Sequence, residues 1–405
     1  MICQPLFNRG DESAHKALIR KLVNSNPVVK ITVLFVDQPK DVVDEFKVHH
    51  NRIIYVNIKS FAFYDFFWRK GLTIKTLWSM HPTILKIIRF MKNSDYVMCA
   101  PGGMDLGGFR DWYHLFWLKL AKKCGRKILY YGRSIGPFPE ASKDEKKFKK
   151  WSLDIMSSFS FLAIRDLKSQ MIADSLSVPY IRTTDCAFLD SPEVILDKEI
   201  YSFLNSDYSI FVPNLLIWHP AYRGKISKEH IIDIYQKVIK LMLDLYPMYR
   251  IVMLPQCFGC KEYEYQDVLF FKEIRDRVLD DRVIVLGDNL SSDIQQSIIK
   301  RAKYLVGARY HSVVFSINQS IPFIALSYEH KIEGLLKSIG YEQCMIDITH
   351  IYEVNEESII FNKLGHILRN LSIDADARDK ASSQAEECFS KLVSFLESGA
   401  DRYSY

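Results

Sequence analysis

Short apolar runs alternate along this chain with segments whose apolar residues recur every three or four positions. The runs at 31–36 (ITVLFV), 96–100 (YVMCA) and 127–132 (KILYYG) are rich in β-branched and aromatic residues, as strands are. The segment at 228–246 has the spacing of an amphipathic helix. Strands that are apolar throughout and are separated by helices predict parallel sheets covered on both faces. We therefore predict an α/β protein.

The strand-like runs form two series along the chain. We predict strands at 31–36, 52–58, 96–100, 127–132, 161–164 and 180–184, and then at 209–215, 250–255, 282–287, 304–308 and 322–327. A chain of 405 residues is too long for one ordinary core and suits two domains. We expect two Rossmann-like domains, 1–200 and 201–375, that face each other across a cleft. Residues 376–405 are expected to form a C-terminal helix and tail that could pack back on the first domain.

The composition excludes several classes of protein. With 48% hydrophobic and 25% charged residues, the chain has the make-up of a soluble globular protein. The formal net charge is +6, but the basic residues are interspersed with acidic ones, so we predict no nucleic-acid partner. No apolar run approaches the length of a membrane span, and the start lacks the pattern of a signal peptide. We therefore expect a cytoplasmic protein.

The eight cysteines are scattered, which fits reduced thiols in a cytosol. Cys257 and Cys260 form one C-x-x-C pair. A structural zinc site needs a second pair of ligands, and none has a suitable spacing. We predict no metal.

Polar residues and glycines follow several predicted strands, where ligands bind in open parallel sheets. They are Gly102, Gly103 and Asp105 after 96–100, Arg133 and Ser134 after 127–132, Arg165 and Asp166 after 161–164, Asp185 after 180–184, Gln256 after 250–255, and Arg309 and His311 after 304–308. The G-x-G-x-x-G spacing of dinucleotide sites is absent from the loop at 101–108. Neither a nicotinamide nor a flavin cofactor is therefore predicted.

Several of these residues also have a purely structural interpretation. Arg165 and Asp166 suit a helix start, with Asp166 as the cap and Arg165 on the surface. Asp185 could be a turn residue, and GRSIGPF (132–138) has the composition of any tight turn. The charged run at 142–151 is best interpreted as the solvated face of a helix.

Arg309 and His311 are the strongest functional candidates. A helix that starts near Ser312 would offer unpaired N–H groups and about half a positive charge at its first turn. The Arg309 fork could grip a carboxylate or phosphate there, and His311 could carry a proton near neutral pH. The pattern predicts a site for a small, doubly charged anion whose leaving group must be protonated or stabilised.

Taken together, these loops resemble the polysaccharide pyruvyl transferase family over roughly residues 7–340. The matching elements follow the family's order: FNRGDESAHKAL (7–18), the Gly-Gly loop, GRSIGPF (132–138), RDLKS (165–169), TDCAFL (184–189), LPQCFG (254–259) and the closest match, 306–340. Only MICQPLF precedes the N-x-G-D-E loop, so the first strand could be short or the native start could lie upstream. Arg133, Cys186 and Cys260 stand where the family more often has Gln, Pro and Pro.

The resemblance implies a glycosyltransferase-B-like (GT-B-like) fold and an enzyme that transfers the pyruvyl group of phosphoenolpyruvate to a sugar. The product would be a cyclic pyruvate ketal, and phosphate would be released. Phosphoenolpyruvate is a co-substrate, and no redox cofactor is required. The resemblance also suggests a capsule, exopolysaccharide or cell-wall pathway, with a sugar or lipid-linked oligosaccharide as the acceptor.

The resemblance also suggests roles for individual residues. His311 would be the general acid and Arg309 the clamp for the donor's carboxylate or phosphate. The other donor-binding residues would be Ser312, Arg165, Gln256 and Lys331, and the acceptor-binding residues would be Asn8, Asp11, Gly102, Gly103, Arg133 and Ser134. Asp105 or Asp11, both expected in loops of the N-terminal domain, would deprotonate the acceptor hydroxyl. We rank Asp11 lower because its preceding strand is uncertain.

The segment at 61–92 combines many aromatic residues with lysines and arginines. It could contact the inner membrane peripherally, or it could be a buried helix pair whose basic side chains reach solvent, which we favour. Two alternative functions stay open. One is a nucleotide-sugar glycosyltransferase, in which Glu329 or Glu333 would hold the ribose. The other is a non-catalytic carbohydrate- or anion-binding protein, against which the titratable His311 argues.

Overall fold

The computed structural model describes residues 1–405 except 5–6, 60–80, 109, 220–221, 259–265, 288, 373–375 and 405. The chain divides into two compact units. The first unit comprises Met1–Leu6, Ala14–Asp190 and Ser382–Tyr405, and the second comprises Phe7–Ser13 and Ser191–Ala381. The longest segment of the first unit ends at Asp190, and the short segment Phe7–Ser13 belongs to the second unit.

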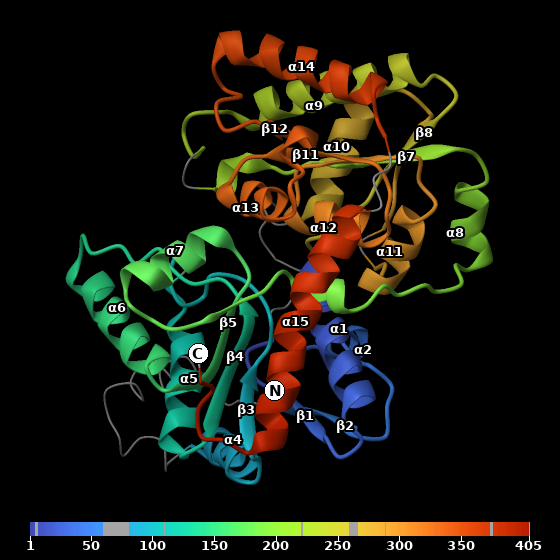
Figure 1. Cartoon of the computed structure of the whole chain (residues 1–405). Coiled ribbons are helices and arrows are strands. Elements are labelled where there is room, and N and C mark those ends of the chain that lie inside the picture. Colours follow the sequence, from blue (N-terminus) through green and yellow to red (C-terminus); the bar gives the residue numbers. More distant parts are fainter. Residues whose placement is uncertain are drawn as a thin grey trace. The chain divides into compact units, whose positions relative to one another are not determined.

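The first unit is built on parallel strands (Figure 1). Its strands are β1 (Ile31–Val36), β2 (Ile53–Ile58), β3 (Tyr96–Cys99), β4 (Lys127–Arg133), β5 (Phe159–Ile164) and β6 (Ile181–Arg182). Its helices are most of α1 (Arg9–Ser25), α2 (Lys40–Glu45), α4 (Pro82–Lys92), α5 (Trp112–Lys123), α6 (Lys143–Met156), α7 (Leu167–Ser175) and most of α15 (Asp376–Ser398). Strands β3-β4-β5-β6 form one sheet in this order, and β1 pairs with β2.

The first residues of the chain join these two sheets. The Met1 carbonyl accepts a hydrogen bond from the Leu34 N–H at 3.0 Å, and the Ile2 N–H donates to the Met98 carbonyl at 2.9 Å. Ile2 forms a single parallel bridge with Cys99. The strand expected before the N-x-G-D-E loop is therefore reduced to this bridge.

The second unit has a six-stranded parallel sheet in the order β12-β11-β10-β7-β8-β9. Its strands are β7 (Tyr208–Val212), β8 (Arg250–Met253), β9 (Val283–Val285), β10 (Leu305–Gly307), β11 (Phe323–Ser327) and β12 (Met345–Asp347). Its helices are α8 (Lys198–Phe203), α9 (Lys228–Leu245), α10 (Asp267–Val278), α11 (Ser292–Ile299), α12 (Tyr310–Asn318), α13 (His330–Ile339) and α14 (Val354–Arg369). Strand β12 was not predicted.

Local signals explain where several helices begin. Ser291 caps α11 by accepting a hydrogen bond from the Ile294 N–H. The charged run at 142–151 forms the start of α6, where Ser142 and Glu145 make a reciprocal capping box. Phe148 is buried while Lys146 and Lys147 are exposed, so the prediction of a solvated helix face is confirmed.

The α/β prediction is confirmed in both units, and α15 covers part of the first. In α15, Phe395 packs against Phe161 of β5 and Tyr96 of β3, with ring centroids 5.6 and 6.0 Å apart. Most of the segment at 61–92, expected to be a helix pair or a membrane contact, lies outside the described residues. Its end forms α4, in which Ile84 and Ile87 are buried. Among the described helices, none is long and apolar enough to cross a membrane.

Candidate functional site

The N-x-G-D-E loop pairs with the loop after β8 in the second unit. The Arg9 N–H donates to the Gln256 carbonyl at 2.9 Å, and the Phe258 N–H donates to the Phe7 carbonyl at 3.1 Å. Asn8 caps the start of α1: its Oδ1 accepts from the Gly10 N–H at 2.8 Å and the next N–H at 3.2 Å. Asn8 and Asp11 were expected in the N-terminal domain. That placement is wrong, because this backbone pairing holds their segment in the second unit.

Two charged residues of this loop are fully buried as a pair. Arg9 lies 2.9 Å from the Glu12 carboxylate, and its guanidinium carbon lies 3.7 Å from the centre of the Phe258 ring. The other Glu12 oxygen accepts from the Ser292 N–H and hydroxyl, at 3.1 and 3.0 Å. Buried charges need such partners. The pair ties the loop to the start of α11 and so holds Gly10 and Asp11, which lie between the two residues.

Gly10 lies against the ring of His311. A Cβ at Gly10 would come within 1.8 Å of His311 Cγ and 1.9 Å of Nδ1, so no larger residue fits without moving the ring. His311 is the second residue of α12 and is only 7% exposed. Oδ1 of the adjacent Asp11 is buried and has no hydrogen-bond partner among the described residues. The structure thus brings Asp11 into the same part of the second unit as His311.

Arg309 occupies the N-cap position of α12, at the end of β10. Its guanidinium pairs with Asp267, and the other Asp267 oxygen accepts from the N–H groups of Gln256 and Cys257 at 2.9 Å each. Burial acts to lower the pKa of Arg309, but the Asp267 carboxylate outweighs it and the pKa is raised above its usual value. Nε of Arg309 has no hydrogen-bond partner in the described part of the chain. Arg309 is therefore held in place and stays positively charged, and its Nε–H is available as a hydrogen-bond donor.

The other donor-binding candidates of the second unit are Gln256, Ser312 and Lys331, and they differ in the contacts that their side chains make. Gln256 is buried, and its side-chain nitrogen has no partner among the described residues. Ser312 is fully buried, and its hydroxyl donates to the Arg309 carbonyl at 2.6 Å, so it closes the first turn of α12. Lys331 lies 3.5 Å from Glu329, whose other oxygen lies 3.8 Å from His219 Nε2.

Glycines let two loops of the first unit touch. Gly102 bridges to Arg133, and Gly107 bridges to Gly136. A Cβ at Gly107, whose φ is +147°, would lie 2.4 Å from the Gly136 backbone. The loops after β3 and β4 are therefore joined at the carboxyl edge of the sheet. Gly103 lies in the loop after β3.

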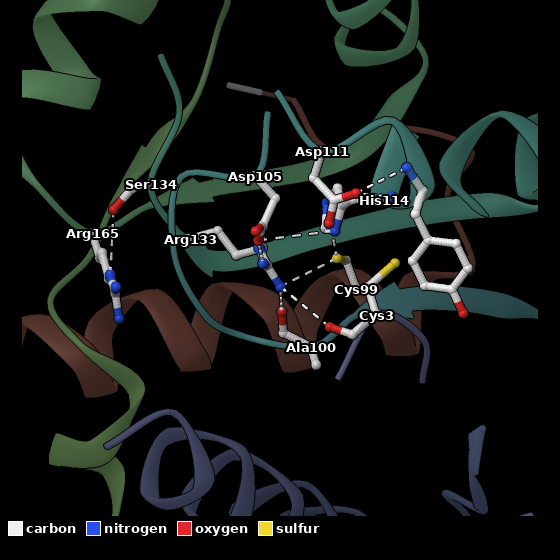
Figure 2. Close-up of polar contacts among 10 residues, drawn as sticks. Cys3, Cys99, Ala100, Asp105, Asp111, His114, Arg133, Ser134 and Arg165 are labelled. Atoms are coloured by element: carbon white, nitrogen blue, oxygen red, sulfur yellow. Dashed lines mark hydrogen bonds and ion pairs between the residues drawn. The ribbon is translucent and has the colours of Figure 1, made fainter. Parts of the chain in front are cut away.

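Arg133 is buried and holds the loop after β3 (Figure 2). Its guanidinium pairs with Asp105 and donates to the Ala100 carbonyl and, at 3.6 Å, to Cys99 Sγ. We expected Arg133 to bind the acceptor. Its side chain is only 1% exposed, however, and its guanidinium is used in the ion pair with Asp105. Asp105 is 24% exposed, and its Oδ2 lies 4.0 Å from His114 Nδ1.

Cys3, Cys99 and His114 lie beside this ion pair (Figure 2). Burial alone would raise the pKa of the Cys99 thiol, but the hydrogen bond with Cys3 and the charges of Arg133 and His114 hold it well below its usual value. Burial and Cys99 raise the pKa of Cys3. Burial acts to lower the pKa of His114, but Cys99 outweighs it and the pKa is raised.

Arg165 is also buried rather than on the surface. It pairs with Asp185. Its Nε donates to the Ser134 hydroxyl at 3.5 Å (Figure 2). Asp166 caps α7 by accepting from the Ser169 N–H at 2.9 Å. The structural interpretation is therefore right for Asp166 and wrong for Arg165. A role for Arg165 in donor binding stays a prediction.

Sequence reasoning missed several residues of these clusters. They are Arg9, Glu12, Asp267 and His219 in the second unit and Cys3, Cys99 and His114 in the first. Asp267 begins a helix instead of ending a strand, so the rule that selected the other residues could not find it. His114 likewise lies within α5, where a histidine in an aromatic run gives no signal.

Several solved structures share the fold of this chain. The UDP-GlcNAc 2-epimerase from Neisseria meningitidis, solved with UDP-GlcNAc, superposes with a TM-score of 0.56 at 12% identity, over 95% of this chain and 97% of that chain. Trehalose-6-phosphate synthase OtsA gives 0.54 at 10% identity, over 94% of each chain. These matches define a GT-B-like α/β protein with parallel sheets, as predicted.

The sequence profile of the family named "Polysaccharide pyruvyl transferase" matches residues 8–330. The chain therefore belongs to the polysaccharide pyruvyl transferase family, and the resemblance is confirmed. A curated relative is the amylovoran biosynthesis protein AmsJ of Erwinia amylovora, which is 24% identical over 277 residues. That match covers 65% of this chain and 64% of AmsJ, so it spans somewhat less than two thirds of either protein.

Proposed function

We propose that this protein transfers the pyruvyl group of phosphoenolpyruvate to a sugar of a polysaccharide precursor. The product is a ketal across two hydroxyls, and phosphate is released. One observation carries the proposal: Arg309 and His311 lie together at the N-terminal turn of α12, with Gly10 fitted against the His311 ring. A fixed guanidinium, backbone N–H groups of a helix start and an imidazole suit a small anion that must be protonated.

The charges around this turn indicate how the donor would be held. Arg309 is paired with Asp267, and Lys331 lies near Glu329, so a carboxylate already balances the positive charge of each residue. Phosphoenolpyruvate would instead be bound by oriented donors: Arg309 Nε, the Gln256 side-chain nitrogen and the first N–H groups of α12. Such preorganised donors stabilise charge without having to reorganise during the reaction.

His311 would start the reaction by giving a proton to the methylene carbon of phosphoenolpyruvate. The neighbouring carbon becomes electrophilic, and a sugar hydroxyl adds to it and loses its proton to a base. The carbon–oxygen bond to phosphate then breaks, and the second hydroxyl closes the ketal and loses its proton. Of the two protons released, one restores His311 and the other leaves on phosphate, so the steps balance.

Asp11 is the base in this proposal. Its Oδ1 has no hydrogen-bond partner among the described residues, and it follows Gly10, which touches His311. Asp105 is paired with Arg133. A neighbouring cation stabilises a carboxylate and so weakens it as a base. Asp11 is therefore preferred to Asp105, the reverse of the order that the sequence suggested.

The acceptor is proposed to be a sugar of a lipid-linked oligosaccharide at the cytoplasmic face of the membrane. The loops that contain Gly102, Asp105 and Ser134 in the first unit are its proposed binding region, with Arg133 as their support. The name of AmsJ, an amylovoran biosynthesis protein, supports an exopolysaccharide precursor as the substrate class.

The test is turnover in heavy water, with phosphoenolpyruvate and a pool of lipid-linked oligosaccharides. The proposal predicts release of phosphate and a ketal whose methyl group carries one deuterium. His311→Ala should bind phosphoenolpyruvate and fail to turn over, whereas His230→Ala, at an exposed histidine, should behave as wild type. Normal turnover by His311→Ala would overturn the assignment of the acid. Transfer from a UDP-sugar instead would identify a glycosyltransferase.

A further inference from the structure

Three metal-ligating side chains converge in the first unit, beside the Arg133–Asp105 pair (Figure 2). Cys3 Sγ, Cys99 Sγ and His114 Nε2 all lie within 4.8 Å of one another. In the part of the chain that the structure describes, this is the one group of three that is close enough to share an ion. We propose that these residues bind a zinc ion, a role that is independent of the proposed pyruvyl transfer.

The spacing fits zinc closely. Zinc–sulfur bonds of about 2.3 Å and zinc–nitrogen bonds of about 2.0–2.1 Å at tetrahedral angles separate a sulfur and a nitrogen ligand by about 3.6 Å. Cys99 Sγ lies 3.6 Å from His114 Nε2. An ion can therefore bind to both atoms with these side chains where they are. Cys3 Sγ, within 4.8 Å of both atoms, would complete a Cys₂His set, and water would take the fourth position.

The three ligands come from separate elements, and each is fixed by its backbone. Cys99 is the last residue of β3. His114 lies in the first turn of α5, and its N–H donates to the capping Asp111 at 3.1 Å. Cys3 follows Ile2, whose N–H and carbonyl each make a 2.9 Å hydrogen bond with residues on either side of Cys99. A set of ligands held in this way loses little freedom when it binds an ion.

The surroundings complete the site. Asp105 Oδ2 lies 4.0 Å from His114 Nδ1, the ring nitrogen that faces away from the sulfurs. The carboxylate thus lies on the side from which zinc sites orient a histidine ligand, and it would have to move closer to form that hydrogen bond. Two thiolates offset the charge of zinc, and Arg133 offsets Asp105, so the buried set is neutral overall. Cys3 is only partly buried, which gives the ion a way in.

An ion here would fasten the start of the chain to β3 and α5. The loop at 101–108 begins two residues after Cys99 and contains Gly102 and Asp105. The zinc ion is therefore expected to stabilise this loop.

The test is metal binding by the purified full-length chain. After removal of metal by a chelator and dialysis against zinc, the wild type should retain one zinc per chain. Cys99→Ser and His114→Gln should each lose more than about 100-fold in affinity, because removing an outer partner alone costs about 10–100-fold. Cys124→Ser removes a cysteine outside the cluster and should bind as wild type. Asp105→Asn should weaken zinc binding about 10–100-fold.

Two further measurements keep the test decisive if a variant does not fold. Cobalt added to the wild type should give a thiolate charge-transfer absorption, and zinc should protect Cys3 and Cys99 from alkylation. Failure to retain zinc, or retention that Cys99→Ser and His114→Gln leave unchanged, would overturn the proposal. So would a Cys3–Cys99 disulfide found by mass spectrometry in protein purified under reducing conditions.

Discussion

Replacement of His15 by phenylalanine should stabilise the protein, and more strongly in acid. His15 lies in α1 within the first unit and is fully buried, edge-on to Phe46 with ring centroids 5.4 Å apart. Neither of its ring nitrogens has a hydrogen-bond partner among the described residues. An unsatisfied buried polar group costs about 1–3 kcal/mol. Phenylalanine keeps the ring contact and removes that cost.

The pH dependence follows from the pKa of His15. Burial lowers this pKa from 6.5 to about 3, and the positive charges of the N-terminus and Lys16 act in the same direction. As the pH falls through 6.5, the unfolded chain takes up a proton on this imidazole and the folded protein does not. Above pH 6.5, His15 therefore leaves the free energy of unfolding of the wild type unchanged. Below that pH, His15 lowers this free energy by about 1.4 kcal/mol per pH unit until the pH reaches the pKa of His15 in the folded protein. From about pH 7.5 to about pH 5 the loss is about 2 kcal/mol.

Urea unfolding at these two pH values measures the effect. The stability difference between His15→Phe and wild type should grow by about 2 kcal/mol in acid, because other titrating groups are common to both proteins. His230→Gln, at an exposed histidine, controls for the loss of one imidazole. A difference that is the same at both pH values, or that His230→Gln reproduces, would refute the reasoning.

Two further predictions concern the proposed donor site. Gly10→Ala puts a methyl group within 1.8 Å of the His311 ring and should lower turnover about 100-fold, measured as kcat at equal folded fraction. Gly365→Ala, whose methyl would meet nothing closer than 3.5 Å, should keep full turnover; equal rates for the two variants would contradict the fit at Gly10. Asp267→Asn leaves the buried charge of Arg309 without its partner and should cost about 3–5 kcal/mol. Urea unfolding checks this, and unchanged stability would mean that the pair does not form.

The strands that lie in continuous apolar runs could be predicted from the sequence. Buried parallel strands are apolar on both faces, so β1 begins and ends where the run ITVLFV does, and β11 lies within the run predicted at 322–327. Strand β12 was missed because its three residues, MID, end in an aspartate, whereas the equally short β9 and β10 lie in the longer apolar runs predicted at 282–287 and 304–308. A run this short shows no periodicity.

Some residues of the candidate site could likewise be predicted from the sequence, and their partners could not. Arg309 and His311 are a local signal, two residues apart at the end of a strand, and the helix predicted near Ser312 begins at Tyr310. The contacts that fix them are not local: Asp267 is 42 positions away from Arg309. Hydrogen bonds between loops, which sequence spacing does not reveal, also decide that the segment around Gly10 belongs to the second unit.

Thermal stabilisation by phosphoenolpyruvate, beside a UDP-sugar, tests the proposed function most directly. A ligand at 100 times its dissociation constant adds about 2.7 kcal/mol, which shifts the melting temperature measurably. The account predicts a shift with phosphoenolpyruvate that Arg309→Ala loses, and no shift with the UDP-sugar. A shift with the UDP-sugar alone, or a phosphoenolpyruvate shift that Arg309→Ala keeps, would contradict it.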